Sequence, residues 1–190
     1  MPSKPPVRRG DESGSGSPGA DVPVVNGWLI LIHPLLLEQL RRLATAVDAE
    51  RPRSRSEGRQ GQNMKLLLAV RHMIFREVPE DPSRSRYRQG GTLGPGLKHW
   101  LRVKFGNGRF RLFYRYRSSD PKMIVFTWMN DAETLRTYGS STDAYAVFRR
   151  MLGKGNPPDE FDRLVTESLA PDVVAGARSL LGQAEPEPPK

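Results

Sequence analysis

The sequence predicts an α+β fold in which two N-terminal helices pack on one face of a small, mainly antiparallel sheet and further helices follow toward the C-terminus. Three observations support this prediction. Apolar residues recur at helical spacing in two segments between residues 34 and 79. A β-hairpin centred on Asn107-Gly108 is followed by another β-rich segment, which gives three consecutive antiparallel strands. Helical patterns return after residue 141, so strands and helices are segregated along the chain.

The chain has 190 residues, which is long enough for one domain with tails. We expect residues 1–22, which include SGSGSPG, and residues 183–190, which end in AEPEPPK, to be disordered, because they hold too little apolar surface to offset the entropy of ordering. The domain itself is predicted over residues 23–168, with a weaker C-terminal helix within residues 169–182.

The first predicted elements are a buried strand and two helices. Apolar and polar residues alternate at the start of residues 24–33, and a continuous apolar run follows, which predicts a short strand. A helix begins at Pro34 and ends near Pro52, with an apolar stripe of Leu36, Leu40, Leu43 and Val47. After a basic connector, Asn63 can cap a second helix that ends at Pro79. The buried side of this helix would consist of Met64, Leu67, Val70 and Ile74.

A long loop and the hairpin follow. Residues 80–97 contain Pro, Gly and three arginines, and a loop of this length indicates a role in holding a ligand. Asn107-Gly108 favours a two-residue type I′ turn. Residues 122–129 supply the third strand. Pairing outward from the turn opposes Phe105 to Phe110, Lys104 to Arg111, Val103 to Leu112, Arg102 to Phe113 and Leu101 to Tyr114.

The last predicted elements are helical. Ser141 can cap a helix that ends at the glycines within residues 153–155. The inward residues of this helix would be Ala144, Val147, Phe148 and Met151. The prolines at residues 157–158 can begin another helix, and a weaker one is predicted over residues 173–181. Because the two N-terminal helices cover one face of the sheet, the other face is predicted to be open.

This predicted open face is strongly basic. Residues 98–117 contain seven Lys or Arg and no acidic residue. Side chains alternate along a strand, so one face of the hairpin is apolar and the other is charged. Like charges this close repel each other unless an anion lies between them, so we expect a polyanion on this face, with RNA as the first candidate. The face collects Trp100, Arg102, Lys104, Arg109, Arg111 and Arg115.

The distribution of charge along the whole chain supports the same prediction. Residues 51–117 carry 17 Lys or Arg and four Asp or Glu, whereas the rest of the chain carries 13 Lys or Arg and 17 Asp or Glu. The formal net charge of +9 therefore comes from one region of the chain. Such asymmetry attracts an anionic partner to one surface. The sequence has no cysteine and no apolar run of bilayer length, which excludes a disulfide framework and predicts a soluble, cytoplasmic protein without membrane contact.

The predicted order of elements and several local sequence strings resemble the YhaV toxins, a branch of the RelE/ParE superfamily of bacterial type II toxin–antitoxin systems. The resemblance covers roughly residues 24–164 and leaves both tails outside. It implies a RelE-like fold and an endoribonuclease that cuts RNA without a metal or other cofactor, inhibits growth and is neutralised by a PrlF-type antitoxin. The matching strings are NGW at 26–28, HP at 33–34, WLRVKFG at 100–106, GRFRLFYRY at 108–116, WMND at 128–131, TLRTYG at 134–139, TDAY at 142–145, VF at 147–148 and the segment 151–158.

RNA carries its own nucleophile, the 2′-hydroxyl. Cleavage therefore needs a base for that hydroxyl, positive charge on the pentacoordinate phosphate and a proton for the 5′-oxygen. Guanidinium groups suit the second need because they are permanently charged and match phosphate oxygens. The base remains open among Tyr138, Lys104, Asp131 and His99. The predicted catalytic residues are Arg102, Lys104, Arg109 and Arg111 on the hairpin, and Arg136 and Tyr138 after the third strand.

A second set of residues is predicted to bind RNA outside the catalytic group. Trp100 and Phe113 share the basic face and could stack on exposed bases, as aromatic residues do in single-strand sites. For both sets a structural alternative exists, in which the aromatic rings pack against a neighbouring loop and the cations form a solvated hairpin edge. The predicted RNA-binding residues are Trp100, Phe113, Arg115, Lys98, Arg86 and Arg88.

The remaining polar groups are predicted to be structural. His99 lies on the opposite face from Arg102 by strand parity, and Asp131 is placed to cap the turn after the third strand, which argues against either as the base. His33 and His72 are assigned to the fold. The segment GGTLGPG lacks the Gly-Lys-Ser/Thr of a phosphate-binding loop. No spacing of ligands predicts a metal site.

Two other functions remain open from the sequence. A non-catalytic RNA-binding or ribosome-associated module would use the same basic strands and aromatic residues. A DNA gyrase poison would share the scaffold, since ParE-type relatives do so without cutting RNA. The substrate of the predicted enzyme would be mRNA, with ribosomal RNA or the ribosome as a further possibility.

Overall fold

We describe residues 22–56 and 58–182 of the protein from a computed structural model. The predicted disordered tails lie outside these residues, except for Val22. The sequence places Val22 in the tail, but its side chain is buried in an apolar cluster of the sheet. The folded part of the chain therefore begins at least one residue earlier than predicted.

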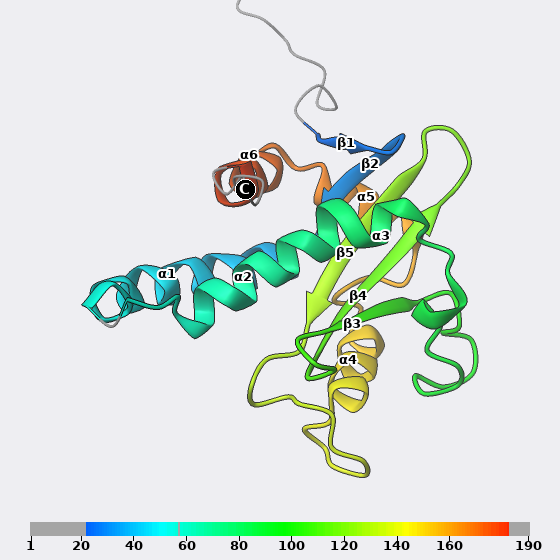
Figure 1. Cartoon of the computed structure of the whole chain (residues 1–190). Coiled ribbons are helices and arrows are strands. Elements are labelled where there is room, and N and C mark those ends of the chain that lie inside the picture. Colours follow the sequence, from blue (N-terminus) through cyan, green and yellow to red (C-terminus); the bar gives the residue numbers. More distant parts are fainter. Residues whose placement is uncertain (1–21, 57, 183–190) are drawn as a thin grey trace, which may run out of the picture.

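A five-stranded mixed sheet forms the centre of the fold, in the order β1-β2-β5-β4-β3 (Figure 1). Strand β2 pairs with β5 in parallel, and the other neighbours are antiparallel. The single strand predicted over residues 24–33 is a small hairpin, because Asn26 and Gly27 both have positive φ and turn the chain back. The strands are β1 (Val24–Val25), β2 (Trp28–Ile32), β3 (Leu101–Phe105), β4 (Phe110–Arg117) and β5 (Met123–Met129).

The β3–β4 hairpin has the predicted register, from Leu101 opposite Tyr114 to Phe105 opposite Phe110. Its turn is also as predicted, since Asn107 and Gly108 have φ of 56° and 77° and the Arg109 amide donates to the Gly106 carbonyl over 3.2 Å. Gly106 has φ of 57°, and a Cβ there would lie 2.8 Å from the Phe110 ring. Glycine is therefore required at this position of the turn.

Two long N-terminal helices pack on one face of the sheet. Helix α1 (Pro34–Ser56) is followed by α2 (Gln62–His72), which continues through a π-helical segment η1 (Met73–Glu77) into the short α3 (Val78–Glu80). The predicted apolar stripes meet the sheet in one core, with Leu36, Leu40, Val70 and Ile74 fully buried.

The ends of these two helices differ from the prediction in three places. Helix α1 runs through Pro52 to Ser56 rather than ending near Pro52. The cap of α2 is Gly61, because the amide and side chain of Asn63 instead donate to the Glu50 carboxylate of α1. The helical segment ends at Glu80, one residue after Pro79.

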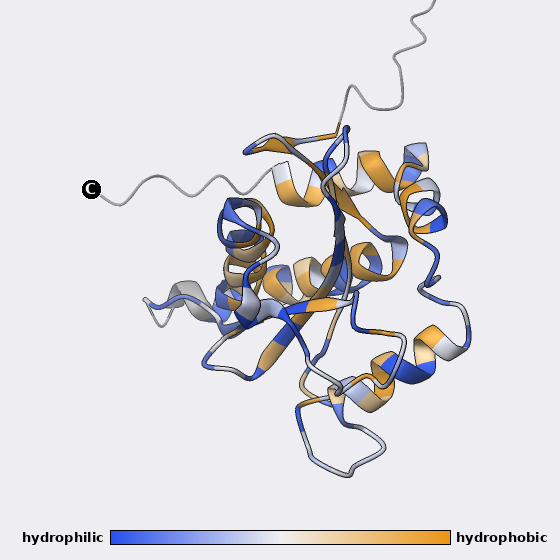
Figure 2. Ribbon diagram, turned by 90° about the vertical axis from the view of Figure 1, so that its right-hand side faces the viewer, coloured by the Kyte–Doolittle hydropathy of each residue, from blue (hydrophilic) through white to orange (hydrophobic). Residues whose placement is uncertain are grey.

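The second face of the sheet is covered, which corrects the prediction that it is open. Helices α4 (Ala144–Gly153) and α5 (Phe161–Ser168) pack on it and form a second core with Leu31, Phe113 and Trp128. Helix α6 (Pro171–Gly182) contacts α1 and β2 and contributes to the first core. Figure 2 views the sheet nearly edge-on and shows helices on both sides of it.

The caps of α4 and α5 are acidic residues. Asp143, not the predicted Ser141, caps α4, and its carboxylate accepts a hydrogen bond from the Tyr145 amide over 3.0 Å. Helix α5 begins after Glu160 rather than at the prolines of residues 157–158. The long loop before β3 includes a 3₁₀ turn, η2 (Ser85–Tyr87), and one bridge from Arg88 to Leu101.

Candidate active site

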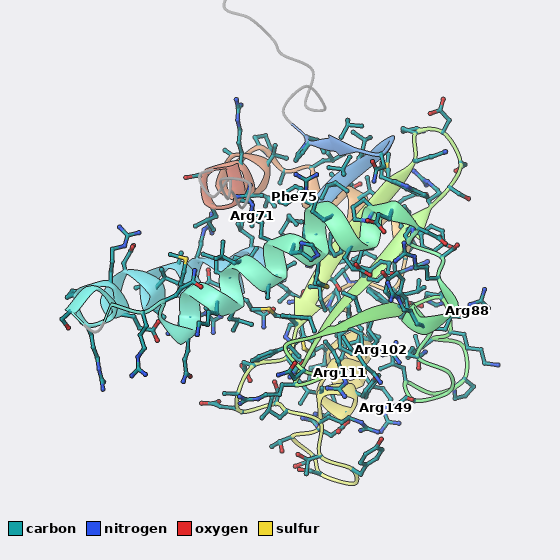
Figure 3. All side chains as sticks on the ribbon, viewed as in Figure 1. Arg71, Phe75, Arg88, Arg102, Arg111 and Arg149 are labelled. Carbon is teal, nitrogen blue, oxygen red and sulfur yellow. The ribbon has the colours of Figure 1, made fainter. Side chains whose placement is uncertain are left out.

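Two arginines of the hairpin are buried where helix α4 begins. Arg102 of β3 and Arg111 of β4 point to the face of the sheet that α4 covers, and they are 9% and 6% exposed. Figure 3 shows both side chains between β3 and α4, with Arg149 of α4 on the same side. Burying an arginine is costly unless its donors find acceptors or a negative charge.

Tyr145, in the first turn of α4, is the residue on which the buried arginines converge. Its hydroxyl accepts a hydrogen bond from Arg102 Nε over 2.9 Å. The guanidinium of Arg111 lies 5.7 Å from the centroid of its ring, and that of Arg136 lies 4.8 Å from it. Cations over an aromatic face are attracted by its quadrupole, so the ring holds both arginines in place. We call Arg102, Arg111, Arg136 and Tyr145 the arginine cluster.

Apart from the bond from Arg102 to the Tyr145 hydroxyl, the side-chain hydrogen bonds of Arg102 and Arg111 go to backbone carbonyls, and none goes to a carboxylate. Arg102 donates to the Arg86 carbonyl over 2.6 Å, and Arg111 donates to the Gly108 carbonyl over 3.2 Å. Among the residues that the structure describes, Arg111 Nε is the one buried side-chain nitrogen or oxygen without a hydrogen-bond partner. The cluster therefore keeps unneutralised positive charge and one unused donor.

Arg136 enters the cluster from the loop after β5. Its guanidinium forms an ion pair with Asp143 and lies 3.8 Å from the centroid of the Tyr138 ring. Burial raises the pKa of Asp143, but the Arg136 hydrogen bond and the amides of Thr137 and Tyr145 outweigh it, so its pKa is lowered. Burial likewise disfavours charged Arg136, and Asp143 more than offsets this and raises the pKa of Arg136.

Asn130 fixes the backbone that carries Arg111. Its side-chain oxygen accepts from the Arg111 amide over 2.6 Å, and its side-chain nitrogen donates to the Arg109 carbonyl over 3.1 Å. Asn130 is fully buried at the end of β5. The end of β5 therefore fixes the turn between β3 and β4, and the arginine cluster is supported by a rigid backbone.

Four further predicted site residues lie around the cluster at the surface. Lys104 is exposed and opposes Arg111 in the hairpin register. Arg109 is exposed at the turn, with its guanidinium 5.7 Å from the Phe110 ring. Tyr138 is 84% exposed beside Arg136, and Arg88 is exposed at its bridge to β3. The structure thus brings together Arg102, Arg111, Arg136 and Lys104, with Arg109 and Tyr138 at the edge.

Trp100 and Phe113 are fully buried, so the structure contradicts the prediction that they stack on RNA bases. Both rings pack against Phe148 of α4, Trp100 edge-on at 5.1 Å and Phe113 stacked at 4.2 Å between centroids. The indole N–H of Trp100 donates to Asp159 over 2.7 Å. The sequence left open that the rings pack against a neighbouring loop; they do pack within the fold, but their neighbour is helix α4 rather than a loop.

The remaining predicted RNA-binding residues serve the fold or stand apart from the cluster. Arg115 donates to the Asp159 carbonyl and lies over the rings of Trp100 and Phe161. Arg86 forms an ion pair with Glu77, while its carbonyl accepts from Arg102. Lys98 is exposed in the loop before β3. The long loop therefore holds a cluster arginine through a backbone carbonyl, while its Arg84 and Arg86 pair with Glu77.

Three of the polar groups predicted to be structural have partners within the fold, and the fourth, His72, is exposed at the end of α2. His99 contacts the Asp159 carboxylate over 2.7 Å, and Asp131 accepts from the Thr134 amide over 2.9 Å and closes a turn. His33 is buried against Glu167, and burial lowers its pKa although Glu167 acts in the opposite direction. These observations leave Tyr138 and Lys104 as candidate bases from the predicted set.

Two residues of the site were missed by sequence reasoning. Tyr145 and Arg149 lie four residues apart and therefore on one side of α4, beside the arginines. The signal that could have found them is the helical stripe itself, because Tyr145 lies three residues before Phe148 and shares its buried face. Within residues 22–56 and 58–182 there is no group of three His, Cys, Asp or Glu suited to a metal ion.

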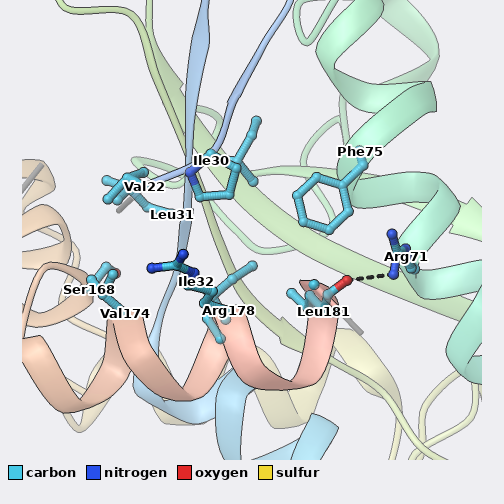
Figure 4. Close-up of a pocket in the computed structure, with 13 residues that line it drawn as sticks. Val22, Ile30, Leu31, Ile32, Arg71, Phe75, Ser168, Val174, Arg178 and Leu181 are labelled. Atoms are coloured by element: carbon cyan, nitrogen blue, oxygen red, sulfur yellow. Dashed lines mark hydrogen bonds between the residues drawn. The ribbon is translucent and has the colours of Figure 1, made fainter. Parts of the chain in front are cut away.

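A separate hollow lies away from the arginine cluster, between β2, η1 and α6 (Figure 4). Its volume is about 380 Å³, and its walls include Ile30, Phe75 and Val174. Arg71 borders it and donates to the Leu181 carbonyl at the end of α6. None of the described helices is long and apolar enough to cross a membrane.

Comparison with known proteins gives a consistent result. The model of a family described as a toxin with endonuclease activity, of a toxin–antitoxin system, matches residues 30–169. Toxin YhaV of Escherichia coli O6:H1 (strain CFT073) is 43% identical over 145 residues, which are 76% of this chain and 94% of that protein. Ribonuclease toxin YhaV of Escherichia coli K12 is 42% identical with the same coverage. No solved structure matches the chain.

Proposed function

This chain belongs to the YhaV family of toxins with endonuclease activity, and from that premise we propose that it cuts RNA by metal-independent attack of the 2′-hydroxyl on the neighbouring phosphate. The observation that carries the proposal is the arginine cluster, in which three guanidinium groups lie against one tyrosine and only one of them, Arg136, pairs with a carboxylate. Cationic donors of this kind suit a phosphate and not a metal ion.

The reaction needs no bond to the protein. The 2′-oxygen forms a bond to phosphorus while the bond from phosphorus to the 5′-oxygen breaks, which leaves a 2′,3′-cyclic phosphate and a 5′-hydroxyl. Negative charge builds up on the phosphoryl oxygens in between. Arg102 and Arg111 would stabilise that charge with guanidinium groups whose hydrogen bonds go to neutral oxygens and not to a carboxylate.

Tyr145 acts as a positioning residue in this proposal. Its hydroxyl orients Arg102, and its ring supports Arg111 and Arg136 from the side of α4. Asp143 caps α4 and also pairs with Arg136. The start of α4 therefore positions Arg136 through Asp143 and Arg102 through Tyr145. A preorganised cluster reduces the reorganisation that accompanies the reaction.

Two surface groups qualify for proton transfer. Tyr138 is exposed beside Arg136, and Lys104 is exposed opposite Arg111. Each lies where the 2′-hydroxyl or the 5′-oxygen of a strand bound over the cluster would pass. The pH–rate profiles of Tyr138→Phe and Lys104→Gln separate their roles, because the variant that lacks the proton-transfer group loses one limb of the profile.

Family membership also supports proposals about the arrangement of the fold, the substrate and the partner protein. We propose that the fold has the RelE-like arrangement, that the substrate is mRNA and that a PrlF-type antitoxin neutralises the protein. The support is the family description as one component of a toxin–antitoxin system.

The test is cleavage of end-labelled RNA by the purified chain in excess EDTA. We expect fragments that end in a 2′,3′-cyclic phosphate, and no cleavage where the nucleotide 5′ to the cut is replaced by its 2′-deoxy counterpart. Retention of RNA without fragments would indicate a non-catalytic binding module. Cleavage that requires a divalent ion, or that survives the 2′-deoxy replacement, would contradict the mechanism.

A further inference from the structure

A cavity of about 620 Å³ lies between helices α1 and α2 and the tip of the β3–β4 hairpin. Building on the proposed function, we propose that it binds a nucleobase of the substrate RNA, one that flanks the phosphate held by the arginine cluster. The cavity would then contribute to the choice of cut site, a property that the catalytic arginines alone do not provide, since phosphate contacts carry no sequence information.

The cavity is connected to the arginine cluster by a single turn. Arg109, Asn107 and Gly106 line it from the hairpin tip. On the other side of that turn, Arg111 donates to the carbonyls of Gly108 and Arg109. If a phosphate of the RNA binds at Arg111, the strand needs to cross only the hairpin turn before its next base reaches the cavity.

The floor of the cavity suits a planar aromatic ring. Phe105 and Phe110 are stacked with their centroids 5.5 Å apart and their planes at 29°. Phe110 is half-buried, so part of its ring faces the cavity, and the Arg109 guanidinium lies 5.7 Å from its centroid. Bases bind to single-strand sites by stacking on aromatic side chains with help from arginine, and this arrangement provides both.

The rim of the cavity carries positive charge and amide groups. Lys65 and Gln62 line it from α2, and Arg42, which pairs with Glu38 over 3.2 Å, lines it from α1. The one acidic residue at the rim is Asp131, and its carboxylate accepts from the Thr134 amide and hydroxyl. Amides pair with the edges of bases and cations pair with the flanking phosphates.

These features favour RNA over a protein segment as the occupant. A groove for an apolar protein helix would need an apolar rim as well as an apolar floor, whereas Arg42, Lys65 and Arg109 line this cavity. The hollow between β2, η1 and α6 is smaller, at about 380 Å³, and it lies away from the arginine cluster (Figures 3 and 4). The two cavities provide a test and its control in one chain.

The experiment uses the full chain and RNA oligonucleotides that contain one cut site, with an abasic nucleotide placed in turn at each position around it. Cleavage is measured under single-turnover conditions below saturation. For wild type we expect one flanking position at which loss of the base slows cleavage roughly 10- to 100-fold, the range for one base stacked on an aromatic residue. In Phe110→Leu this penalty should fall below about threefold.

Phe75→Leu is the matched control, since Phe75 is another half-buried phenylalanine at a cavity wall but faces the hollow beside α6. It should keep the wild-type abasic penalty. Lys65→Gln tests the rim without touching the core and should weaken cleavage of intact RNA severalfold while the abasic penalty persists. Thermal unfolding of each variant shows whether the fold is retained.

The outcomes separate this inference from the proposed function. If wild type cuts RNA but no abasic position matters, or if Phe110→Leu keeps the full penalty, the inference is overturned and the nuclease proposal stands. If wild type cuts no RNA at all, the proposed function fails. If Phe110→Leu leaves RNA discrimination unchanged but weakens binding of the cognate antitoxin, the occupant is a protein and the inference is wrong.

Discussion

The arginines at the two ends of strand β4 have opposite environments. At one end, Arg111 is buried beside Arg102 with backbone carbonyls and an aromatic ring as neighbours. At the other end, Arg117 forms a 2.6 Å ion pair with Asp162, and both side chains are solvent-accessible. The sequence presents them as one continuous basic run, yet only one end keeps unneutralised positive charge.

The difference shows that the partner of a cation, and not the cation count, marks a functional site. A cation paired with a carboxylate at the surface has its charge satisfied and contributes little. A buried cation without a carboxylate raises the free energy of the free protein, and an anion that binds there relieves this cost. Arg84 and Arg86 follow the first pattern, since both pair with Glu77.

The strongest test of this comparison is loss of one buried arginine. Arg102→Ala or Arg111→Ala should slow single-turnover RNA cleavage by roughly 10²- to 10³-fold, the effect of removing one donor to transition-state charge. RNA binding should weaken much less, because most phosphate contacts remain. Rates near wild type for both variants would refute the assignment of the cluster to catalysis.

Tyr145→Phe is expected to have the next largest effect. The change leaves Arg102 Nε without its acceptor and should lower the free energy of unfolding by about 1–3 kcal/mol. Because Arg102 is then held only by its bond to the Arg86 carbonyl, cleavage should slow by roughly 10- to 100-fold. A positioning role predicts the same loss at every pH, so pH–rate profiles of variant and wild type should be parallel. A change in the shape of the profile would instead indicate that the hydroxyl transfers a proton.

Much of this site could be predicted from sequence because local rules fix a hairpin. Asn107-Gly108 sets the turn, and the turn sets which residues pair, so Lys104 opposite Arg111 followed without a structure. The strand period also placed Arg102 and Arg111 on one face. The helix onset at Pro34 and the buried stripe of α2 were likewise accessible to simple periodicity.

What covers a sheet face is decided by contacts between distant segments, and the sequence pattern does not contain this information. Trp100 and Phe113 share a face with the arginines, and their burial depends on Phe148 arriving from α4. The amphipathic pattern of α4 shows that it needs an apolar partner without showing which one. Tyr145 was missed for the same reason, since its role exists only where α4 meets the hairpin.

Asp143→Asn should separate the charge of the cap from its geometry. Asn can still cap α4, but it loses the ion pair with Arg136, and we expect a loss of about 1–2 kcal/mol in the free energy of unfolding at neutral pH. The folded-state pKa of Asp143 is lowered, so its stabilisation is complete above the ordinary carboxyl pKa and is lost as pH falls through the folded value.

The measurement is chemical denaturation of wild type and Asp143→Asn from pH 7 down to pH 2. The difference between them should be constant above about pH 4 and shrink at lower pH as wild-type Asp143 is protonated. A difference that grows on acidification would show that the carboxylate destabilises the fold, contrary to the observed contacts.

Arg117→Ala is expected to have the smallest effect and completes the comparison. Arg117 lies on the same strand as Arg111, but its ion pair with Asp162 is accessible to solvent, so its loss should change the free energy of unfolding by at most about 1 kcal/mol. Cleavage should stay within about twofold of wild type, because no cluster residue contacts Arg117. The single-turnover assay used for Arg111→Ala measures both variants side by side. If Arg117→Ala were as slow as Arg111→Ala, the total basic charge would matter more for cleavage than an arginine that is buried without a carboxylate partner. The distinction between the two ends of β4 would then not hold.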